Sequence, residues 1–536
     1  MEGAVTAPAD DLLARVAHLE CDLAAAVAAR DQYKALYEQL REECEKLKRG
    51  LLGQQAERVP TDDRQLTLAL LETLLAQHGA PALVQTEKVR AHERQKPRGR
   101  QPLPAHLPRV DVELIPFEVQ QGGLEQFRRI GEEVSEVLER RRASSVVVRV
   151  IRPKFVAKDA PRQGPVRVLI GDPADLPILR GRAGPGMLAD TIVRRWQDHQ
   201  PLHRLERIYA RDGLVLARST LCGWHGELAT LARPIVEAMH AEALQQPYLC
   251  TDATGVLVQA PEQCRHGHFW VLIAPALHVL FRYSPRHTSA AVDQLLAGYQ
   301  GFLVADAHAV YDHLFVDGHV VEVGCWSHLR RYWFKTLGSE PEKGREALAM
   351  IGALFAIERS LVDATPAQRH GVRSATARPI VQKFFDWCAD LKASALDETP
   401  LAKAIGYATN HQPAFEQFLA DGRLPIHNNW SELQLRRQVI GRRNWLFVGS
   451  DAGAEVNTVF VSLLASCGLH QLEPWTYLRD LFCLLPGWPK SRVLDLAPAY
   501  WKKTLEDDDT QKRLADNPFR SAIMALDRLH PDDDDP

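Results

Sequence analysis

Between Tyr248 and Trp326 the sequence alternates short apolar runs with polar turns, and this alternation constrains the fold more than any other feature. Three runs rich in β-branched and aromatic residues come first, YLCTDATGVLVQ, HFWVLIAPA and LHVLFRYSP, and they predict three strands. Helical periodicity in RHTSAAVDQLLAGYQ follows, then a buried strand in GFLVADAHAVY, a short helix in YDHLFVDG and a strand in HVVEVGCW. A long helical stretch then begins at SHLRRYWFKTLG and reaches about Asp421.

Three strands, a helix, a strand, a helix and a strand form the order of the ribonuclease-H-like fold. In this fold the first and fourth strands are neighbours, so Asp252 in the first and Asp306 at the end of the fourth would project together. Two close carboxylates repel each other, and a bound divalent cation relieves this repulsion. Two Mg²⁺ ions on such hard oxygen ligands can clamp the attacking and leaving oxygens of a phosphoryl displacement. The plainer alternative is that each aspartate is a turn residue.

A third carboxylate comes from the helix predicted in IHNNWSELQLRRQVIGRRNWLFVGSDAGA. Glu432 lies near its start, where the helix dipole favours an acid and where Asn428 or Asn429 could cap the helix. We expect Glu432 to complete the metal site, and four arginines to face phosphate oxygens: Arg436, Arg437, Arg442 and Arg443. A solvated helix with a Glu–Arg ion pair at i,i+4 also fits this segment when it is taken alone.

The N-terminal region predicts self-association and a basic arm. Residues 12–47 follow a heptad pattern that starts at Leu12, Val16 and Leu19, which predicts a coiled coil pairing copies of the chain into a homodimer or larger assembly. A helix packed on its own chain is the alternative. The stretch KVRAHERQKPRGRQPLPAHLPR carries seven Lys/Arg against one Glu. It predicts an extended arm that enters a minor groove, unless it is a solvated linker; its candidate DNA-binding residues are Lys96, Arg98 and Arg100.

Residues 110–182 predict a small β-containing module, with short strands in SSVVVRVIRPKFVA. Three helical patterns follow, GPGMLADTIVRRWQDH, PLHRLERIYARDG and ARSTLCGWHGELATLARPIVEAMHAEAL. The turn at Gly213 between the last two predicts a helix-turn-helix whose final helix enters a major groove. Arg218, Ser219 and Thr220 are its candidate DNA-binding residues, and the latter two are also candidate caps. An ordinary helical bundle is the alternative.

Composition excludes several classes of protein. Hydrophobic residues make up 46% and charged residues 25%, as in a soluble globular protein. We see no secretory signal and no apolar run long enough to span a bilayer. Nine cysteines without a C-x-x-C pair indicate a reducing compartment. The net charge of −3 argues against a surface uniformly coated by nucleic acid. We expect a cytoplasmic protein.

From about residue 30 to 501 the chain resembles the long transposase of the insertion-sequence-sixty-six family, a bacterial DDE transposase. The matching segments are PLHRLERIYARDGLVLARSTLCGW, TDATGVLV, VADAHAVY, CWSHLRRYWF, HNNWSELQLRRQVIGRRNWLFVGSDAGA and LEPWTYLRDLFCLLP. The resemblance implies that Asp252, Asp306 and Glu432 are the catalytic and metal-binding triad, with two Mg²⁺ ions or Mn²⁺ as a substitute. It implies double-stranded DNA partners, both terminal inverted repeats and target DNA, no membrane and a location at the bacterial nucleoid, and it leaves open whether accessory proteins of the same element are required.

The sequence departs from this family in two places. The family's zinc-binding module has paired cysteines, but none lies between Cys44 and Cys222, so we expect no zinc. The first acidic motif, TDAT, lacks the glutamate that usually follows the aspartate. Metal ligation by Cys325 with His328, or by Cys264 with nearby histidines, is a weaker alternative to burial. His328 could orient a catalytic carboxylate or contact DNA, and Arg330 and Arg331 are candidate DNA-binding residues.

Together these patterns predict a multidomain α/β protein with a ribonuclease-H-like core and an all-helical insertion. The expected parts are a coiled coil (1–52), a helix plus basic arm (53–109), the β-containing module (110–182), the helix-turn-helix (183–245), the first part of the core (246–338), the insertion (339–424), the final core helix (425–470) and a C-terminal helical segment with an acidic tail (471–536). We expect Mg²⁺-dependent 3′-end cleavage and strand transfer. A catalytically inactive, site-specific DNA-binding derivative is the rival hypothesis, and a nuclease without strand transfer differs only in product.

Overall fold

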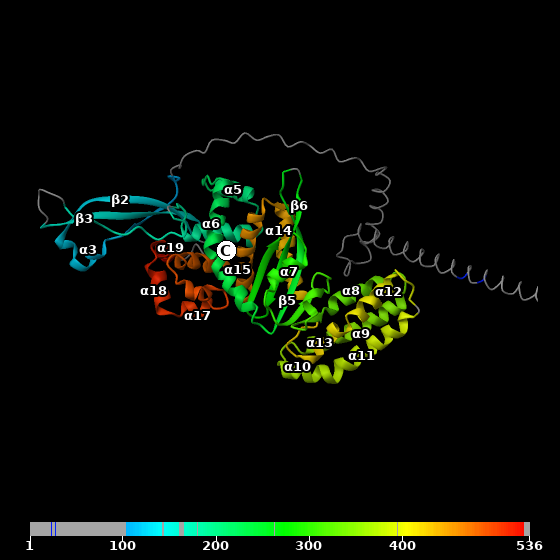
Figure 1. Ribbon diagram of the computed structural model, residues 1–536. Helices are drawn as coiled ribbons and strands as arrows, with labels where there is room; N and C mark the ends of the chain where they lie inside the picture. Colours follow the sequence, from blue (N-terminus) through cyan, green and yellow to red (C-terminus); the bar gives the residue numbers. More distant parts are fainter. Residues whose placement is uncertain are drawn as a thin grey trace, which may run out of the picture. The chain divides into compact units, whose positions relative to one another are not determined.

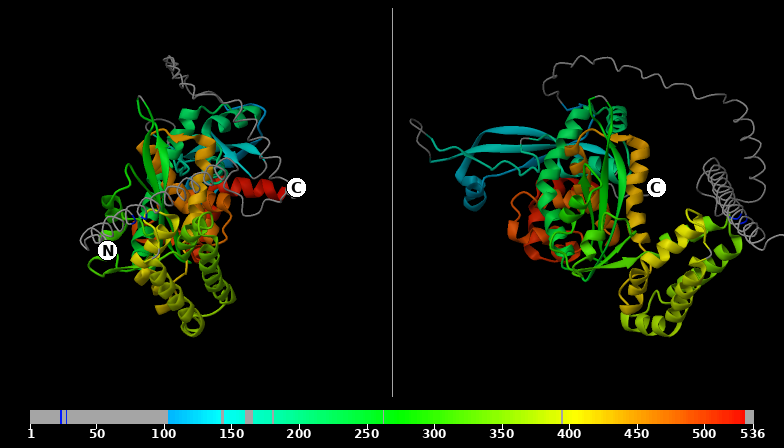
Figure 2. Two further views of the ribbon diagram at one scale, coloured as in Figure 1. Left: turned by 90° about the vertical axis from the view of Figure 1, so that its right-hand side faces the viewer. Right: turned by 45° about the vertical axis from the view of Figure 1, so that its right-hand side comes forward.

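The computed structural model describes residues 103–529, with gaps at 142–143, 160–165, 180, 262 and 394, and in addition Leu23 and Val27. The predicted coiled coil, apart from these two positions, and the basic arm with Lys96, Arg98 and Arg100 lie outside the described residues. Within the described residues the chain divides into two compact units, one of residues 323–427 and one of residues 103–322 with 428–529. Figures 1 and 2 show their elements, and each unit is described by itself.

The larger unit begins with a four-stranded sheet in the order β1-β3-β2, with β4 on β3. Its strands are β1 (Arg109–Glu113), β2 (Phe127–Arg140), β3 (Ser145–Ala157) and β4 (Leu169–Ile170). The inner half of the β2–β3 hairpin packs Val137, Val148 and Val150 against Phe519 of α19 (Pro518–Leu529). The strands predicted here as short are long, because cross-strand ion pairs such as Lys154–Glu133 at 2.9 Å support the exposed outer half.

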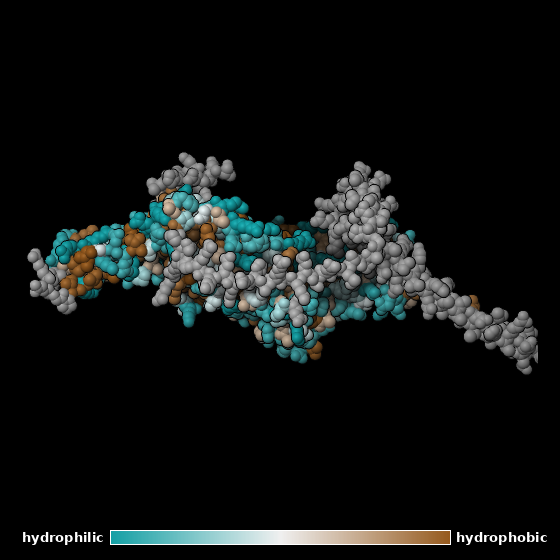
Figure 3. Space-filling model, turned by 90° about the horizontal axis from the view of Figure 1, so that it is seen from above, coloured by the Kyte–Doolittle hydropathy of each residue, from teal (hydrophilic) through white to brown (hydrophobic). Residues whose placement is uncertain are grey.

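The outer end of this hairpin exposes several large apolar side chains, and Figure 3 shows hydrophobic surface near that end. Among them are Ile130 and Val134 on β2, and Phe117 on the short helix α3 (Phe117–Gly122). Within the described residues of this unit these side chains stay uncovered, since the first nine residues of β2 are exposed or half-buried. The module is therefore a hairpin with one buried end.

Helices follow at the positions that the sequence predicts. They are α4 (Pro185–Ile192), which continues into a π-helical turn (Val193–Gln197), α5 (Leu202–Arg211) and α6 (Arg218–Ala243). Capping of α6 by Ser219 or Thr220 was a wrong prediction: the N-cap is Ala217, which is extended and makes no side-chain cap. Ser219 and Thr220 therefore lie inside the first turn. Most of α6 beyond that turn is a core helix, since its buried residues run from Leu221 to Ala243.

The second sheet has the strand order β7-β6-β5-β8-β9, and β10 also pairs with β5. Its strands are β5 (Tyr248–Val258), β6 (Arg265–Ala274), β7 (His278–Ser284), β8 (Gly301–Ala305), β9 (Val320–Gly324) and β10 (Phe447–Val448). β5, β6 and β7 are antiparallel neighbours, whereas β8 and β10 run parallel to β5. Between the strands lie α7 (Ser289–Leu295) and a 3₁₀ turn (Asp312–Phe315).

α15 (Asp451–Leu469) protects the outer edge of this sheet. The Ser466 hydroxyl bonds both the N–H of Val279, at 3.0 Å, and its carbonyl, at 3.1 Å, and the Ser462 hydroxyl accepts from the N–H of Phe281 at 2.7 Å. These serines take the place of a neighbouring strand at an edge that would otherwise have free backbone groups. Among the described helices α15 alone is long and apolar enough to cross a membrane, but 67% of its apolar window is buried inside the fold.

The C-terminal segment of the larger unit is helical. It contains α16 (Pro474–Leu484), a 3₁₀ segment (Lys490–Leu496), α17 (Trp501–Leu505), α18 (Asp508–Asp516) and α19. The 26-residue helix α6 and this segment meet where the Tyr500 hydroxyl donates to Glu242.

The smaller unit, as far as the structure describes it, is the helical part from Val323 to His427. Its helices are α8 (Trp326–Thr336), α9 (Pro341–Ser360), α10 (Pro366–Val372), a π-helical turn (Arg373–Ala377), α11 (Arg378–Lys392), α12 (Pro400–Asn410) and α13 (Gln412–Ala420). The Trp326 ring contacts the rings of Phe384 and Phe415, both at 5.5 Å. Arg373 is fully buried and paired with Glu358 at 2.7 Å. The compact helical unit thus includes α8, ahead of residue 339.

Candidate active site

Asp252 and Asp306 occupy matching positions on two neighbouring parallel strands. The paired residues of β5 and β8 are Tyr248↔Phe302, Leu249↔Leu303 and Cys250↔Val304. Continuing this register by two residues sets Asp252 opposite Asp306, which directly follows β8. Because side chains two residues apart share a face of a sheet, and neighbouring strands are about 4.8 Å apart, both carboxylates lie on one face at adjacent positions.

Tyr311 gives independent support for this placement. Its ring is 2% exposed and makes an edge-on contact with Trp270 at 6.2 Å. Burial raises the pKa of the Tyr311 hydroxyl first, and the negative charges of Asp306 and Asp252 raise it further. The same phenol therefore lies within electrostatic reach of both carboxylates. Tyr311 ends the VADAHAVY segment, but it was not among the predicted site residues.

Helix α14 (Asn429–Trp445) is fixed along the edge of β5 that carries Asp252. On this edge β8 pairs with the start of β5 and β10 pairs with its end, so the backbone between them has no neighbouring strand. Side chains of α14 and its N-cap replace that strand: Asn428 Nδ2 donates to the Thr251 carbonyl at 2.7 Å, and Arg442 donates to the Gly255 carbonyl. Figure 1 shows α14 beside this sheet.

Glu432 is half-buried in the first turn of α14 and directly follows Ser431, whose side chain bonds Asn428. The Ser431 hydroxyl donates to Asn428 Oδ1 at 2.7 Å, so the Asn428 side chain joins the start of the helix to the residue before Asp252. Asn428 is the N-cap residue by position but its side chain makes no cap bond. The structure gives it a different task from the predicted cap, since it connects the helix to the strand. Asn429 is exposed.

The four arginines of α14 fall into two groups. Arg442 Nη1 also bonds Thr254 Oγ1 at 3.0 Å, and Arg437 Nη1 bonds Gln197 Oε1 at 2.7 Å, so these two hold the helix in place. Arg436 and Arg443 are exposed. They lie four and eleven residues after Glu432, a spacing that puts all three along one side of a helix. Of the predicted phosphate-facing arginines, these two are the ones that the structure leaves available.

A family comparison matches the part of the chain that contains this arrangement. The family model described as "Transposase IS66 family" covers residues 180–456, which is more than half of the chain and includes Asp252, Asp306 and Glu432. The chain belongs to the IS66 transposase family. A second model, described as "Transposase C of IS166 homeodomain", covers residues 39–112, of which only the last ten are described structurally.

Two curated relatives are similar to this chain over most of its length. The IS66-family chain is 27% identical over 492 residues to "Uncharacterized protein y4hP" of Sinorhizobium fredii (strain NBRC 101917 / NGR234), which covers 86% of this chain and 88% of the relative. It is 29% identical over 474 residues to "Uncharacterized protein y4qI" of the same strain, and this match covers 83% of this chain and 85% of the relative. The similarity therefore extends well beyond the sheet and α14.

The remaining predicted residues of this transposase lie on three other segments. Arg218, Ser219 and Thr220 are all exposed in the first turn of α6. His328, Arg330 and Arg331 lie on α8, in the smaller unit, and Arg331 is exposed. The basic arm lies outside the described residues. The structure therefore brings together Asp252, Asp306 and the start of α14, all within the larger unit.

No group of three or more His, Cys, Asp or Glu side chains within the described residues is gathered closely enough to hold a metal ion. This removes the alternative that Cys264 with His266 and His268 forms such a site, and Cys325 is a buried side chain at the end of β9. Asp252, Asp306 and Glu432 therefore do not form a three-ligand metal site in this structure, although β5, β8 and α14, which carry or adjoin them, are neighbours.

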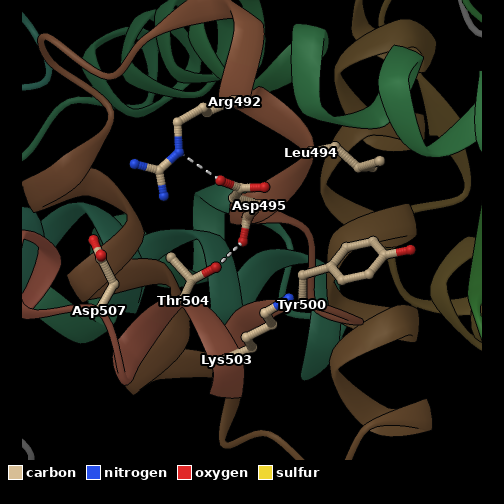
Figure 4. Close-up of a pocket in the computed structure, with 7 residues that line it drawn as sticks. All are labelled: Arg492, Leu494, Asp495, Tyr500, Lys503, Thr504 and Asp507. Carbon is tan, nitrogen blue, oxygen red and sulfur yellow. Dashed lines mark hydrogen bonds and ion pairs between the residues drawn. The ribbon is translucent and has the colours of Figure 1, made fainter.

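A pocket of about 410 Å³ in the C-terminal segment is remote in sequence from the acids, and several of its polar groups bond to one another (Figure 4). Arg492 pairs with Asp495 at 2.8 Å, and the Thr504 hydroxyl donates to the Asp495 carbonyl at 2.6 Å. These contacts stabilise the turn between the 3₁₀ segment and α17. None of the three acids of β5, β8 and α14 lines this pocket, so we assign it no part in the candidate active site.

Proposed function

We propose that this IS66-family protein is an active DNA transposase that cleaves the 3′ ends of its element and joins them to target DNA. The observation that carries the proposal is the register of β5 and β8, whose last pair, Cys250↔Val304, lies two residues before Asp252 and Asp306. Asn428 ties the start of α14, whose first turn contains Glu432, to the same strand β5. On this proposal the three acids, far apart in sequence, act together at this edge of the sheet.

The donor set suits Mg²⁺, because carboxylate oxygens are the hard ligands that this ion prefers. Asp252, Asp306 and Glu432 would hold it, with Mn²⁺ as a substitute, and phosphate oxygens of the DNA and waters would complete the coordination that the protein leaves open. Bound ions would supply Lewis acidity and an activated water for an in-line displacement at phosphorus. The protein's own part is to fix the three carboxylates on a rigid sheet and an anchored helix. No zinc is proposed.

The strand order β7-β6-β5-β8-β9, with three antiparallel neighbours followed by β8 parallel to β5, supports a ribonuclease-H-like core interrupted by the helical unit. We assign DNA backbone contacts to Arg436 and Arg443 beside Glu432, because they are exposed on its side of α14. We assign base contacts to the exposed first turn of α6, as expected for the N-terminal end of a recognition helix.

The proposal includes assembly and location. The heptad segment would pair protomers as a homodimer or larger assembly, so that two terminal inverted repeats are processed together. The basic arm would add minor-groove contacts. The protein would work in the bacterial cytoplasm, at the nucleoid.

The test is Mg²⁺-dependent nicking of DNA that carries the sequences flanking the gene. Asp306→Asn keeps the side-chain shape but removes the charge, so we expect its nicking to fall to background. Asp317→Asn is the matched control, because Asp317 is exposed in the loop after the 3₁₀ turn. Full nicking by Asp306→Asn would refute the proposal.

A catalytically inactive, site-specific DNA-binding protein is the second candidate. The TDAT motif and the absence of a three-ligand cage among the described residues favour it. The two candidates separate in a titration with Mg²⁺: the enzyme shows metal-dependent strand breakage, whereas the inactive derivative binds the flanking DNA with no divalent-ion requirement.

A further inference from the structure

The turn that follows β8 carries an imidazole next to Asp306. The backbone N–H of His308 donates to Asp306 Oδ1 at 3.3 Å, and Ala307 between them has a φ of 55°, in the left-handed region. This tight turn brings residue 308 back toward the carboxylate instead of continuing the strand. The His308 side chain is exposed at the edge of the sheet where we place the DNA strand.

One hydrogen bond fixes the position of the proton on this ring. The N–H of Val310 donates to His308 Nδ1 at 3.2 Å. A backbone amide can only donate, so Nδ1 must accept and carries no proton, and the proton of the neutral ring is on Nε2. Within the described part of the chain, Nε2 has no hydrogen-bond partner. The ring is therefore a donor that points outward, and in this tautomer Nε2 is not available as a metal ligand.

Neighbouring rings hold this imidazole in a defined orientation. His308 meets His287 edge to face at 4.7 Å and 85°, and His287 lies flat on Trp270 at 4.7 Å and 2°. Trp270 is 1% exposed and its indole N–H donates to Ser284 Oγ at 2.7 Å. The stack therefore rests on a buried ring with a satisfied polar group, and His308 loses little conformational freedom when it binds a ligand.

We propose that His308 Nε2–H donates a hydrogen bond to a non-bridging phosphate oxygen of the DNA strand bound beside Asp306. The inference rests on the proposed transposase function and adds a substrate-contacting residue to it. Carboxylates repel an anionic strand, so a neutral donor fixed next to one of them improves both the binding and the orientation of the phosphate. His308 acts on the phosphate and leaves the cations to the acids.

Two substitutions separate the two nitrogens of the ring. His308→Asn places an amide oxygen near the position of Nδ1 and so keeps an acceptor for Val310, but it has no group at the position of Nε2. His308→Gln places an amide N–H near Nε2 and loses the acceptor. Full-length proteins are compared in Mg²⁺-dependent nicking of DNA that carries the sequences flanking the gene. His308→Asn should lose about ten- to one-hundredfold in kcat/KM, and His308→Gln should recover most of it.

His319→Asn is the matched control, since His319 is exposed before β9 and lies outside the turn. Thermal unfolding midpoints of all variants should agree with the parent, and the Mg²⁺ concentration for half-maximal nicking should not change. Three results would overturn the inference: full activity of His308→Asn, equal losses in both His308 variants, or a raised Mg²⁺ requirement. Asp306→Asn is assayed in parallel. If it nicks normally, the proposed function itself fails; if it is inactive while His308→Asn is fully active, only the role of His308 fails.

Discussion

Asn428→Asp tests the connection between α14 and β5 with a change of one atom type. The Asn428 side chain is fully buried, its Nδ2 donates to the Thr251 carbonyl at 2.7 Å and its Oδ1 accepts from the Ser431 hydroxyl at 2.7 Å. Aspartate keeps the acceptor for Ser431. It replaces the donor by an oxygen that faces the Thr251 carbonyl, so the bond between helix and strand is removed while the side-chain volume is kept.

The expected cost follows from these contacts. A buried carbonyl that loses its donor costs about 1–3 kcal/mol, and a buried charge without a partner adds to this, so we expect about 2–4 kcal/mol at pH 8. Burial and the facing carbonyl should raise the pKa of the new carboxyl group above that of an unfolded aspartate. Its protonated form can donate to Thr251. Because the folded-state pKa is raised, the variant should be least stable at high pH and should recover as the pH falls through that pKa.

The free energy of unfolding is measured by urea titration with tryptophan fluorescence at pH 8 and pH 5. Asn429→Asp is the matched control, because it introduces the same charge at the same helix start on an exposed side chain, where the helix dipole favours an acid by about 0.3–1 kcal/mol. Equal unfolding free energies for the two variants at pH 8 would refute the reasoning, since the buried bond to Thr251 would then contribute nothing.

Three further predictions concern charged groups in defined surroundings. Burial raises the pKa of Glu139 from 4.5 to about 7, so the stability that its protonated form contributes is lost as the pH rises through that range. In urea titrations, the unfolding free energy of Glu139→Gln should therefore rise by about 3 kcal/mol relative to that of the parent between pH 4 and pH 8. A difference between the two proteins that does not change with pH would contradict this. Arg442→Met should lower the unfolding free energy by about 1–3 kcal/mol, whereas Arg443→Met should leave it within about 0.5 kcal/mol and reduce the salt dependence of DNA binding by about one unit of slope; the reverse pattern would be incompatible with the contacts of these arginines. Arg373→Met leaves Glu358 without its buried partner and should destabilise the helical unit by about 3–5 kcal/mol in calorimetry, and a cost near zero would show that the pair is not structural.

Much of the central sheet could be predicted from the sequence, because local patterns define it. The apolar runs around Asp252 and before Asp306 are long enough to be recognised as strands, and the structure has β5 and β8 there. The helix that carries Glu432 was also recognisable, with Asn428 directly before its first residue. These features depend on residues within one segment, which is the range over which periodicity and turn chemistry act.

Contacts between distant segments were not predictable in the same way. Whether Arg437 and Arg442 face phosphate or protein depends on the positions of Gln197 and Gly255, which no local pattern defines. Ser219 was predicted as a helix cap, but α6 begins earlier, at Arg218, because the extended residue before the helix is Ala217. A shift of the helix start by one or two residues is enough to change which residue is the cap. Besides burial, Asp306 and Asp252 raise the pKa of the Tyr311 hydroxyl, and the proximity of these two carboxylates appears only when the register of the sheet is known.

Iron-mediated cleavage of the polypeptide tests the central claim most directly. Fe²⁺ replaces Mg²⁺ in the complex with DNA that carries the flanking sequences, and ascorbate with peroxide then generates radicals that cut the chain beside bound metal. The account predicts cuts near Asp252, Asp306 and Glu432, suppressed by excess Mg²⁺ and absent in Asp306→Asn. Cuts confined to one of these segments, or clustered elsewhere in the chain, would contradict the convergence of the three acids on shared cations.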